Sequence, residues 1–245
     1  MQLSDIHMFA FYAPDFWRPS SAAGDLQSII DSDLVHRLTK VLRIEIGEIF
    51  VLFDQKLCGQ VKVQEISKKE IVVEIITVVV QTERNDKIVF WLPLLKREAL
   101  QEAVYSLAEI GVSSIQLVIT QKSRQNLLHD KEFERLQATV IAAAEQSKNY
   151  QFPELLKPEK LEMLLQHSSA TSVDIVFDVS GDRYHALYSK IQQASVLRLL
   201  VGPEGGLTDV ELKNVQTLGF LTCRLTDTIL RAVQSVALAA GLFRL

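Results

Sequence analysis

The sequence predicts an α/β protein in two parts: a small N-terminal β unit and a larger C-terminal domain with a mainly parallel sheet. Residues 48–80 form three short runs rich in Val, Ile and Phe, which is typical of strands. From residue 87 onward, five apolar strands alternate with helical stretches, a pattern that predicts a parallel sheet covered by helices. The polar stretch 81–87 separates the two patterns, so we place one domain at 1–80 and the other at 85–245.

Each expected element has a local signal. Asp54-Gln55 and Ser67-Lys68-Lys69 supply the turns between the N-terminal strands. Leu100 and Leu107 recur at helical spacing in 96–112, and Gly111 supplies a C-terminal stop. The five C-terminal strands are expected at 87–95, 114–120, 173–179, 197–201 and 220–226. The other helices are expected at 132–148, 186–193, 208–218 and 229–243.

Composition narrows the class of protein. The chain of 245 residues is 48% hydrophobic and 23% charged, and it contains no apolar run long enough to span a bilayer. Two cysteines and a start without a secretory signal favour the cytoplasm, and no metal site is implied. The net charge of -4 leaves nucleic-acid binding open, because a local cluster of Lys and Arg is enough for it.

The stretch RLLVGPEGGLTDVEL at 198–212 is the first unusual feature. Thr208 and Glu211 match a capping box, so a helix is expected to follow the loop directly. The loop lacks both a P-loop lysine and a GxGxxG pattern, which disfavours nucleotide phosphate. Gly202, Gly205 and Gly206 leave the main chain bare, so a flat or neutral ligand could approach it closely. The alternative is that these glycines serve only to form a tight turn, whose backbone requires positive φ.

The second unusual feature is Arg231 in LTDTILRAVQSVALAAGLF, residues 225–243. With Thr226 or Thr228 as the N-cap, Arg231 would lie in the first turn of an almost wholly apolar helix. A cation there opposes the helix dipole at a cost of about 0.3–1 kcal/mol, which points to a functional role. The alternative is that Arg231 pairs with Asp227 or Glu204.

These two C-terminal stretches together resemble the signature of the RsmE-type ribosomal RNA methyltransferases of the SPOUT superfamily. The resemblance extends over most of the chain, through HRLTKVLRIEIGEIFVLFD at 36–54, LAEIGVSSIQLVIT at 107–120 and IAAAEQS at 141–147. It implies a PUA-like N-terminal β-barrel that binds RNA, a SPOUT-type domain tied in a trefoil knot, and a homodimer.

The resemblance also implies S-adenosylmethionine as cofactor and methylation of uridine N3 in 16S ribosomal RNA of the small subunit. Arg231 and Glu204 are the implied catalytic residues, with Asp227 or Glu145 as further carboxylates. The positions that match the cofactor loops are Leu200, Val201, Gly202, Pro203, Gly205, Gly206, Leu225, Thr226, Thr228, Ile229 and Leu230. The positions expected to contact RNA are His36, Arg37, Lys40, Arg43, Lys96 and Arg97.

The chain departs from the family pattern beside the expected active site. Ala232, Val233 and Gln234 follow Arg231 where the family has Thr-Glu-Thr, which removes a carboxylate. A relative that binds RNA without methylating it is therefore the alternative function. An α/β oxidoreductase or phosphotransferase is a third class, and the missing phosphate-loop motifs disfavour it. For the six basic positions, a solvated surface is the plain alternative to an RNA contact.

Overall fold

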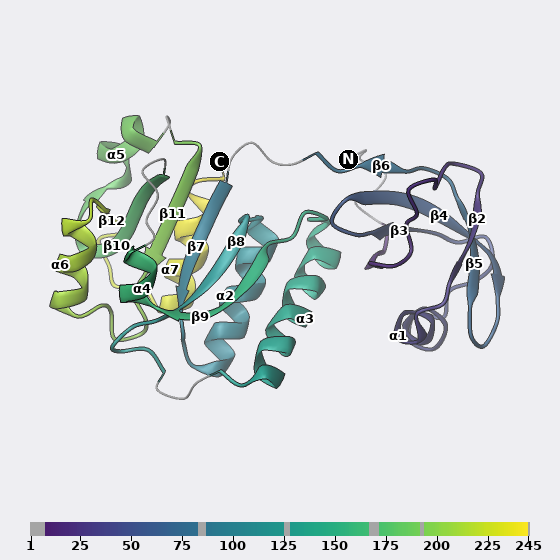
Figure 1. The fold of residues 1–245 in the computed structure, drawn as a ribbon, viewed down its shortest axis with the longest axis horizontal. Helices are drawn as coiled ribbons and strands as arrows, with labels where there is room; N and C mark the ends of the chain where they lie inside the picture. Colours follow the sequence, from purple (N-terminus) through teal and green to yellow (C-terminus); the bar gives the residue numbers. More distant parts are fainter. Residues whose placement is uncertain (1–7, 83–86, 125–127, 167–171, 192–193, 245) are drawn as a thin grey trace. The chain divides into compact units, whose positions relative to one another are not determined.

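The computed structural model describes the chain except residues 1–7, 83–86, 125–127, 167–171, 192–193 and 245 (Figure 1). It divides into two compact units. Unit 1 comprises Met1–Glu83 and Ala144–Gln151, and unit 2 comprises Arg84–Ala143 and Phe152–Leu245. The sequence did not predict that 144–151, which includes the end of a long helix, would group with the N-terminal residues.

Unit 1 is built on one six-stranded sheet in the order β1-β3-β4-β5-β2, with β6 paired to β4. Only the β1–β3 pair is parallel. The Asp54 carboxylate accepts the N–H groups of Lys56 and Leu57 and so closes the predicted β3–β4 turn. The elements are β1 (Ala10–Tyr12), β2 (Leu26–Ile29), α1 (Ser32–His36), the π-helical turn η2 (Arg37–Val41), β3 (Ile49–Phe53), β4 (Leu57–Ile66), β5 (Ile71–Ile75) and β6 (Val79–Val80).

Unit 2 contains a second six-stranded sheet in the order β12-β10-β11-β7-β8-β9, in which every strand pair is parallel. The mainly parallel sheet of the prediction is therefore confirmed. The strands are β7 (Lys87–Pro93), β8 (Ser114–Ile119), β9 (Glu154–Lys160), β10 (Ser172–Arg183), β11 (Val196–Val201) and β12 (Leu221–Arg224). The sequence missed β9, an edge strand that contains Pro158 and only one buried residue, Leu155.

Helices cover both faces of this sheet (Figure 1). Side chains of α2, α3, α5 and α7 share one core, and α4 and α6 share the other, because neighbouring strand residues such as Leu199 and Leu200 point to opposite faces. Gly111 ends α2 with φ 87°, as expected. The helices are α2 (Arg97–Ile110), α3 (Asp130–Ser147), α4 (Leu161–Gln166), α5 (Tyr184–Ile191), α6 (Asp209–Thr217) and α7 (Ala232–Gly241).

The distal part of β10 folds around β12. Cys223 is the register partner of both Phe177 and Asp182, with a shift between the two pairings. Gly181 permits this approach, because a Cβ on it would lie 2.6 Å from the carbonyl carbon of Thr222. The end of β10 thereby lies beside the end of β12, while the end of β11 at Val201 lies beside Phe177 in the middle of β10. In an open parallel sheet, this edge is where ligands bind.

Candidate functional site

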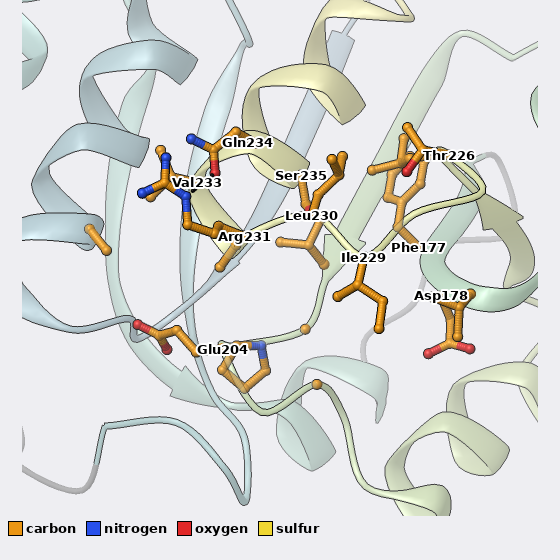
Figure 2. Close-up of a pocket in the computed structure, with 18 of the residues that line it drawn as sticks. Phe177, Asp178, Glu204, Thr226, Ile229, Leu230, Arg231, Val233, Gln234 and Ser235 are labelled. Carbon is orange, nitrogen blue, oxygen red and sulfur yellow. Dashed lines mark hydrogen bonds between the residues drawn. The ribbon is translucent and has the colours of Figure 1, made fainter.

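A cavity of about 650 Å³ opens at this edge of unit 2 (Figure 2). Its walls come from the middle of β10, the ends of β11 and β12, the loops that follow β11 and β12, the first two turns of α2 and the first turn of α7. The lining residues are Glu98, Ala99, Glu102, Phe177, Asp178, Val179, Val201, Gly202, Pro203, Glu204, Gly206, Leu207, Arg224, Leu225, Thr226, Thr228, Ile229, Leu230, Arg231, Ala232, Val233, Gln234 and Ser235.

The first wall is the glycine loop, residues 202–207. A Cβ on Gly202 would lie 2.9 Å from both the Cα of Gly206 and the nitrogen of Leu207, so only glycine fits this fold of the main chain. Gly206 has φ +69° and donates its N–H to the carbonyl of Pro203 at 2.8 Å. Gly206 therefore forms the tight turn with positive φ that was the alternative explanation of the glycines. The main chain of the same loop also lines the cavity.

The second wall is the threonine loop, residues 225–230. Thr226 donates its hydroxyl to the carbonyl of Thr228 at 2.6 Å, which curves the loop. Ile229 lines the cavity and is 89% exposed, so its apolar side chain is accessible to a ligand. Within the part of the chain that the structure describes, the main-chain N–H groups of residues 228–230 donate to no protein acceptor. They are available to a ligand.

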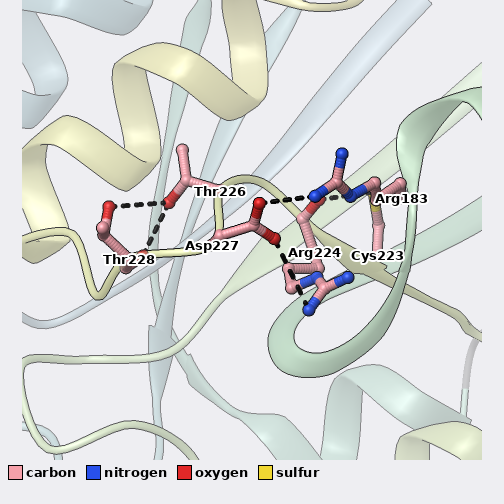
Figure 3. Close-up of polar contacts among 6 residues, drawn as sticks. All are labelled: Arg183, Cys223, Arg224, Thr226, Asp227 and Thr228. Carbon is pink, nitrogen blue, oxygen red and sulfur yellow. Dashed lines mark hydrogen bonds and ion pairs between the residues drawn. The ribbon is translucent and has the colours of Figure 1, made fainter.

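Asp227 anchors the threonine loop from outside the cavity (Figure 3). Its carboxylate accepts a hydrogen bond from Arg183 at the end of β10, and it lies 3.6 Å from the guanidinium of Arg224 in β12. Asp227 is therefore engaged with two cations, and the proposed pairing of Arg231 with Asp227 is wrong. Because Asp227 does not line the cavity, it is also not placed to act on a ligand there.

Arg231 lies just before the first turn of its helix, not within that turn as the sequence indicated. The N-cap of α7 is Arg231 itself rather than Thr226 or Thr228, and the helix begins at Ala232. The threonines instead hydrogen-bond within their own loop. The Nε of Arg231 donates to the side-chain oxygen of Gln234 at 3.0 Å, and Arg231 makes no ion pair among the described residues. Figure 2 shows its guanidinium at the cavity.

Glu204 does not pair with Arg231 either. Its Oε1 accepts the main-chain N–H of Lys96 at 3.0 Å, and Lys96 is the N-cap of α2. A carboxylate beside the first turn of a helix is favourable because it meets the positive end of the helix dipole. Glu204 therefore ties the glycine loop to the start of α2 while it lines the cavity.

The structure gathers most, but not all, of the expected cofactor positions. Leu200 is fully buried in the core beneath the cavity, and Gly205 faces the side chain of Lys122 rather than the opening. The other nine line the cavity.

Lys96 and Arg97 lie at the start of α2 outside the lining, whereas their neighbours Glu98, Ala99 and Glu102 belong to it. The sequence also missed Phe177, Asp178 and Val179, although they end the strand expected at 173–179, which was a usable signal.

Comparison with known proteins identifies the larger part of the chain. Residues 82–244 match the model of the RNA methyltransferase domain. The chain belongs to the RNA methyltransferase family. The matched residues include both loops of the cavity and every strand of the unit 2 sheet.

Relatives within this family agree with the RsmE-type resemblance. Ribosomal RNA small subunit methyltransferase E of Mesomycoplasma hyopneumoniae is 28% identical over 61% of this chain and 66% of its own length. The protein of the same name from Synechocystis is 26% identical over 84% of this chain and 68% of its own. The alignments thus span about two thirds of each relative. The same enzyme from Neisseria gonorrhoeae, solved bound to S-adenosyl methionine, has the same fold, with a TM-score of 0.84 at 22% identity over 96% of each chain.

The basic residues expected on the RNA-binding part of this methyltransferase lie in different settings in unit 1. Arg37 forms an ion pair with the largely buried Glu145, and its guanidinium lies 5.1 Å from the centre of the Phe11 ring. Glu145 also accepts the main-chain N–H of Tyr12 at 3.0 Å, so both interactions of this carboxylate are with residues of unit 1. Arg37 is itself exposed, as are the other three, His36, Lys40 and Arg43. Arg43 lies beyond the π-helical turn η2, which ends at Val41, and has φ 56°.

Two further features bear on the class of protein. No helix among the described residues has both the length and the apolar character needed to cross a membrane. In the same residues, no group of three or more His, Cys, Asp or Glu side chains is placed to hold a metal ion.

Proposed function

We propose that this RNA methyltransferase binds S-adenosylmethionine in the unit 2 cavity and methylates N3 of a uridine in 16S ribosomal RNA of the small subunit. The observation that carries the proposal is the pair of loops with exposed main chain at the carboxyl edge of the sheet. The relatives named for small-subunit ribosomal RNA and the neighbour bound to S-adenosyl methionine support the choice of substrate and cofactor.

The residues present fit this cofactor. The volume of about 650 Å³ lies in the range of small-molecule sites. The free N–H groups of residues 228–230 suit the acceptor edge of a purine, and the exposed Ile229 offers it an apolar surface. Among the lining side chains, four carboxylates (Glu98, Glu102, Asp178 and Glu204) outnumber the two arginines (Arg224 and Arg231), which favours a ligand with positive charge.

We assign the chemical roles in methyl transfer to individual side chains. When bound, S-adenosylmethionine supplies a methyl group on a positively charged sulfur. N3 of uridine carries a proton, and as this proton leaves, negative charge spreads to the two flanking carbonyl oxygens. The guanidinium of Arg231, held by Gln234 through Nε alone, keeps its other N–H groups free to stabilise that charge. Glu204 is the carboxylate that we assign to accept the proton.

We extend the proposal to the architecture. The fold of β10 around β12 supports a trefoil knot, in which the threonine loop is drawn through the chain. The sheet of unit 1 with the exposed His36, Lys40 and Arg43 supports a PUA-like domain that binds RNA. In unit 2, we assign an RNA contact to Lys96 and Arg97 at the start of α2. The nearly apolar α7 exposes Leu238, which supports a homodimer, and the site of action is the cytoplasm.

The test is to map N3-methyluridine in small-subunit ribosomal RNA from cells with and without the gene. One modified uridine should disappear in the deletion strain and return on complementation with the wild-type gene. Arg231→Ala should not restore it, because the guanidinium is lost, whereas Arg18→Ala, which removes an exposed cation in unit 1, should restore it fully. An unchanged methylation map in the deletion strain contradicts the proposal.

The second candidate function is an RNA-binding protein without methyl transfer. It is favoured by Ala232 and Val233, which place two apolar side chains in the cavity wall beside Arg231. Under this alternative the protein binds unmodified small subunits, while the methylation map is the same with and without the gene.

A further inference from the structure

Lys122 lies in the turn between β8 and α3 and holds the glycine loop from behind. Its Nζ donates to the carbonyl of Gly205 at 2.9 Å and to the carbonyl of Leu207 at 3.2 Å. Its methylene stem packs on the same loop, since a Cβ on Gly205 would lie 3.2 Å from the Cδ of Lys122. Lys122 itself does not line the cavity. One exposed side chain therefore fixes two peptide groups of a cavity wall without occupying the cavity.

A second tie joins the same two segments. Gln121, the neighbour of Lys122, donates its main-chain N–H to Glu211 at 2.7 Å. Glu211 is only 3% exposed, and its other carboxylate oxygen accepts the N–H of Thr208 at 2.9 Å in the capping box of α6. The turn is closed on itself, because Thr120 donates its N–H to the hydroxyl of Ser123. The glycine loop is thus braced against a turn that has its own fixed shape.

These contacts orient the loop carbonyls. The carbonyls of Gly205 and Leu207 are held on the Lys122 side, and the N–H groups of the same two peptides are bound by Pro203 and Glu211. Both peptide planes are therefore fixed before any ligand enters. A loop that is ordered in advance loses less conformational entropy when its ligand binds, which strengthens binding.

We propose that Lys122 is a positioning residue that preorders the glycine loop for the methyl donor. This proposal rests on the proposed function for the identity of the ligand, while the brace itself is a property of the free protein. It assigns to Lys122 an effect on donor affinity, exerted through the main chain of the loop, and no contact with donor or RNA.

The experiment compares Lys122→Met, which keeps most of the stem and removes the donor group, with Lys122→Arg, which keeps a cationic donor. Lys213→Met on α6 is the matched control, because it removes an exposed lysine outside the brace. Amide hydrogen exchange reports the order of the loop through the N–H of Gly206, and calorimetry with S-adenosylmethionine reports affinity. Steady-state methylation separates KM for the donor from kcat.

Lys122→Met should weaken donor binding about tenfold, or about 1.4 kcal/mol. It should raise KM for the donor, leave kcat unchanged, and speed exchange at Gly206 without faster exchange in β7 or α2. Lys122→Arg should recover most of the affinity. Wild-type exchange and affinity in Lys122→Met overturn the proposal, as does a loss of order throughout unit 2. If the wild-type protein binds no S-adenosylmethionine, the proposed function fails, and exchange at Gly206 still decides whether the brace exists.

Discussion

Gly202 gives the sharpest test of the glycine loop. In Gly202→Ala the new Cβ would lie 2.9 Å from the Cα of Gly206, 2.9 Å from the nitrogen of Leu207 and 3.0 Å from the carbonyl carbon of Gly206. Ordinary contacts at a Cβ are 3.4–4 Å, so the main chain must move by about half an ångström. Overpacking of this kind costs about 1–3 kcal/mol, too little to unfold a domain but enough to displace a cavity wall.

The assay is calorimetric titration with S-adenosylmethionine, alongside urea denaturation. Gly202→Ala should lower the free energy of unfolding by about 1–3 kcal/mol and weaken binding at least tenfold. Gly241→Ala is the matched control, because its Cβ meets no atom within 4 Å and alanine favours the helix by up to about 1 kcal/mol. It should bind as the wild-type protein does. Wild-type affinity in a folded Gly202→Ala protein would refute the reasoning.

Three further outcomes follow from single side chains. Arg37→Met leaves the carboxylate of Glu145 without its cation, and chemical denaturation should show a loss of about 1–3 kcal/mol. Burial raises the pKa of the Cys223 thiol from 9.0 to about 11, so above pH 9 the unfolded thiol ionises first. The native state then binds more protons than the unfolded state, and urea titrations should show stability falling between pH 9 and 11. Gln234→Met frees the guanidinium of Arg231, and kcat should fall about three- to tenfold at unchanged donor affinity.

Each of these outcomes has a contrary result. Loss of RNA binding in Arg37→Met without loss of stability would show that the cation faces RNA and not the internal carboxylate. A Cys223→Ala protein with the same decline above pH 9 as the wild type would assign that decline to other groups. A weaker donor affinity with unchanged kcat in Gln234→Met would show that Gln234 contacts the donor and does not act through Arg231.

Much of the fold follows from local pattern. The strands of unit 2 that lie inside the sheet are mostly apolar, because both of their faces are covered, and the sequence shows them plainly. The capping box at Thr208 and the stop at Gly111 are also local signals, and both are confirmed. The strand β9 is different, since an edge strand with Pro158 carries neither an apolar run nor a regular alternation.

The candidate site could be predicted less completely, because it depends on partners far apart in the chain. The glycine loop and Arg231 are visible in the sequence, whereas the bond from Lys122 to Gly205 spans 83 residues. The partner of Arg37 lies 108 residues away, and only the structure shows that this cation is already paired. The start of α7 was misplaced because the threonines that resemble caps satisfy their own loop.

The most direct test of the central claim is a crystal structure of the protein grown with S-adenosylhomocysteine. The account predicts the ligand in the unit 2 cavity, with its purine against the N–H groups of residues 228–230 and the guanidinium of Arg231 facing the open side. A ligand bound elsewhere, or a cavity filled by the protein's own side chains while the ligand is absent, would contradict it.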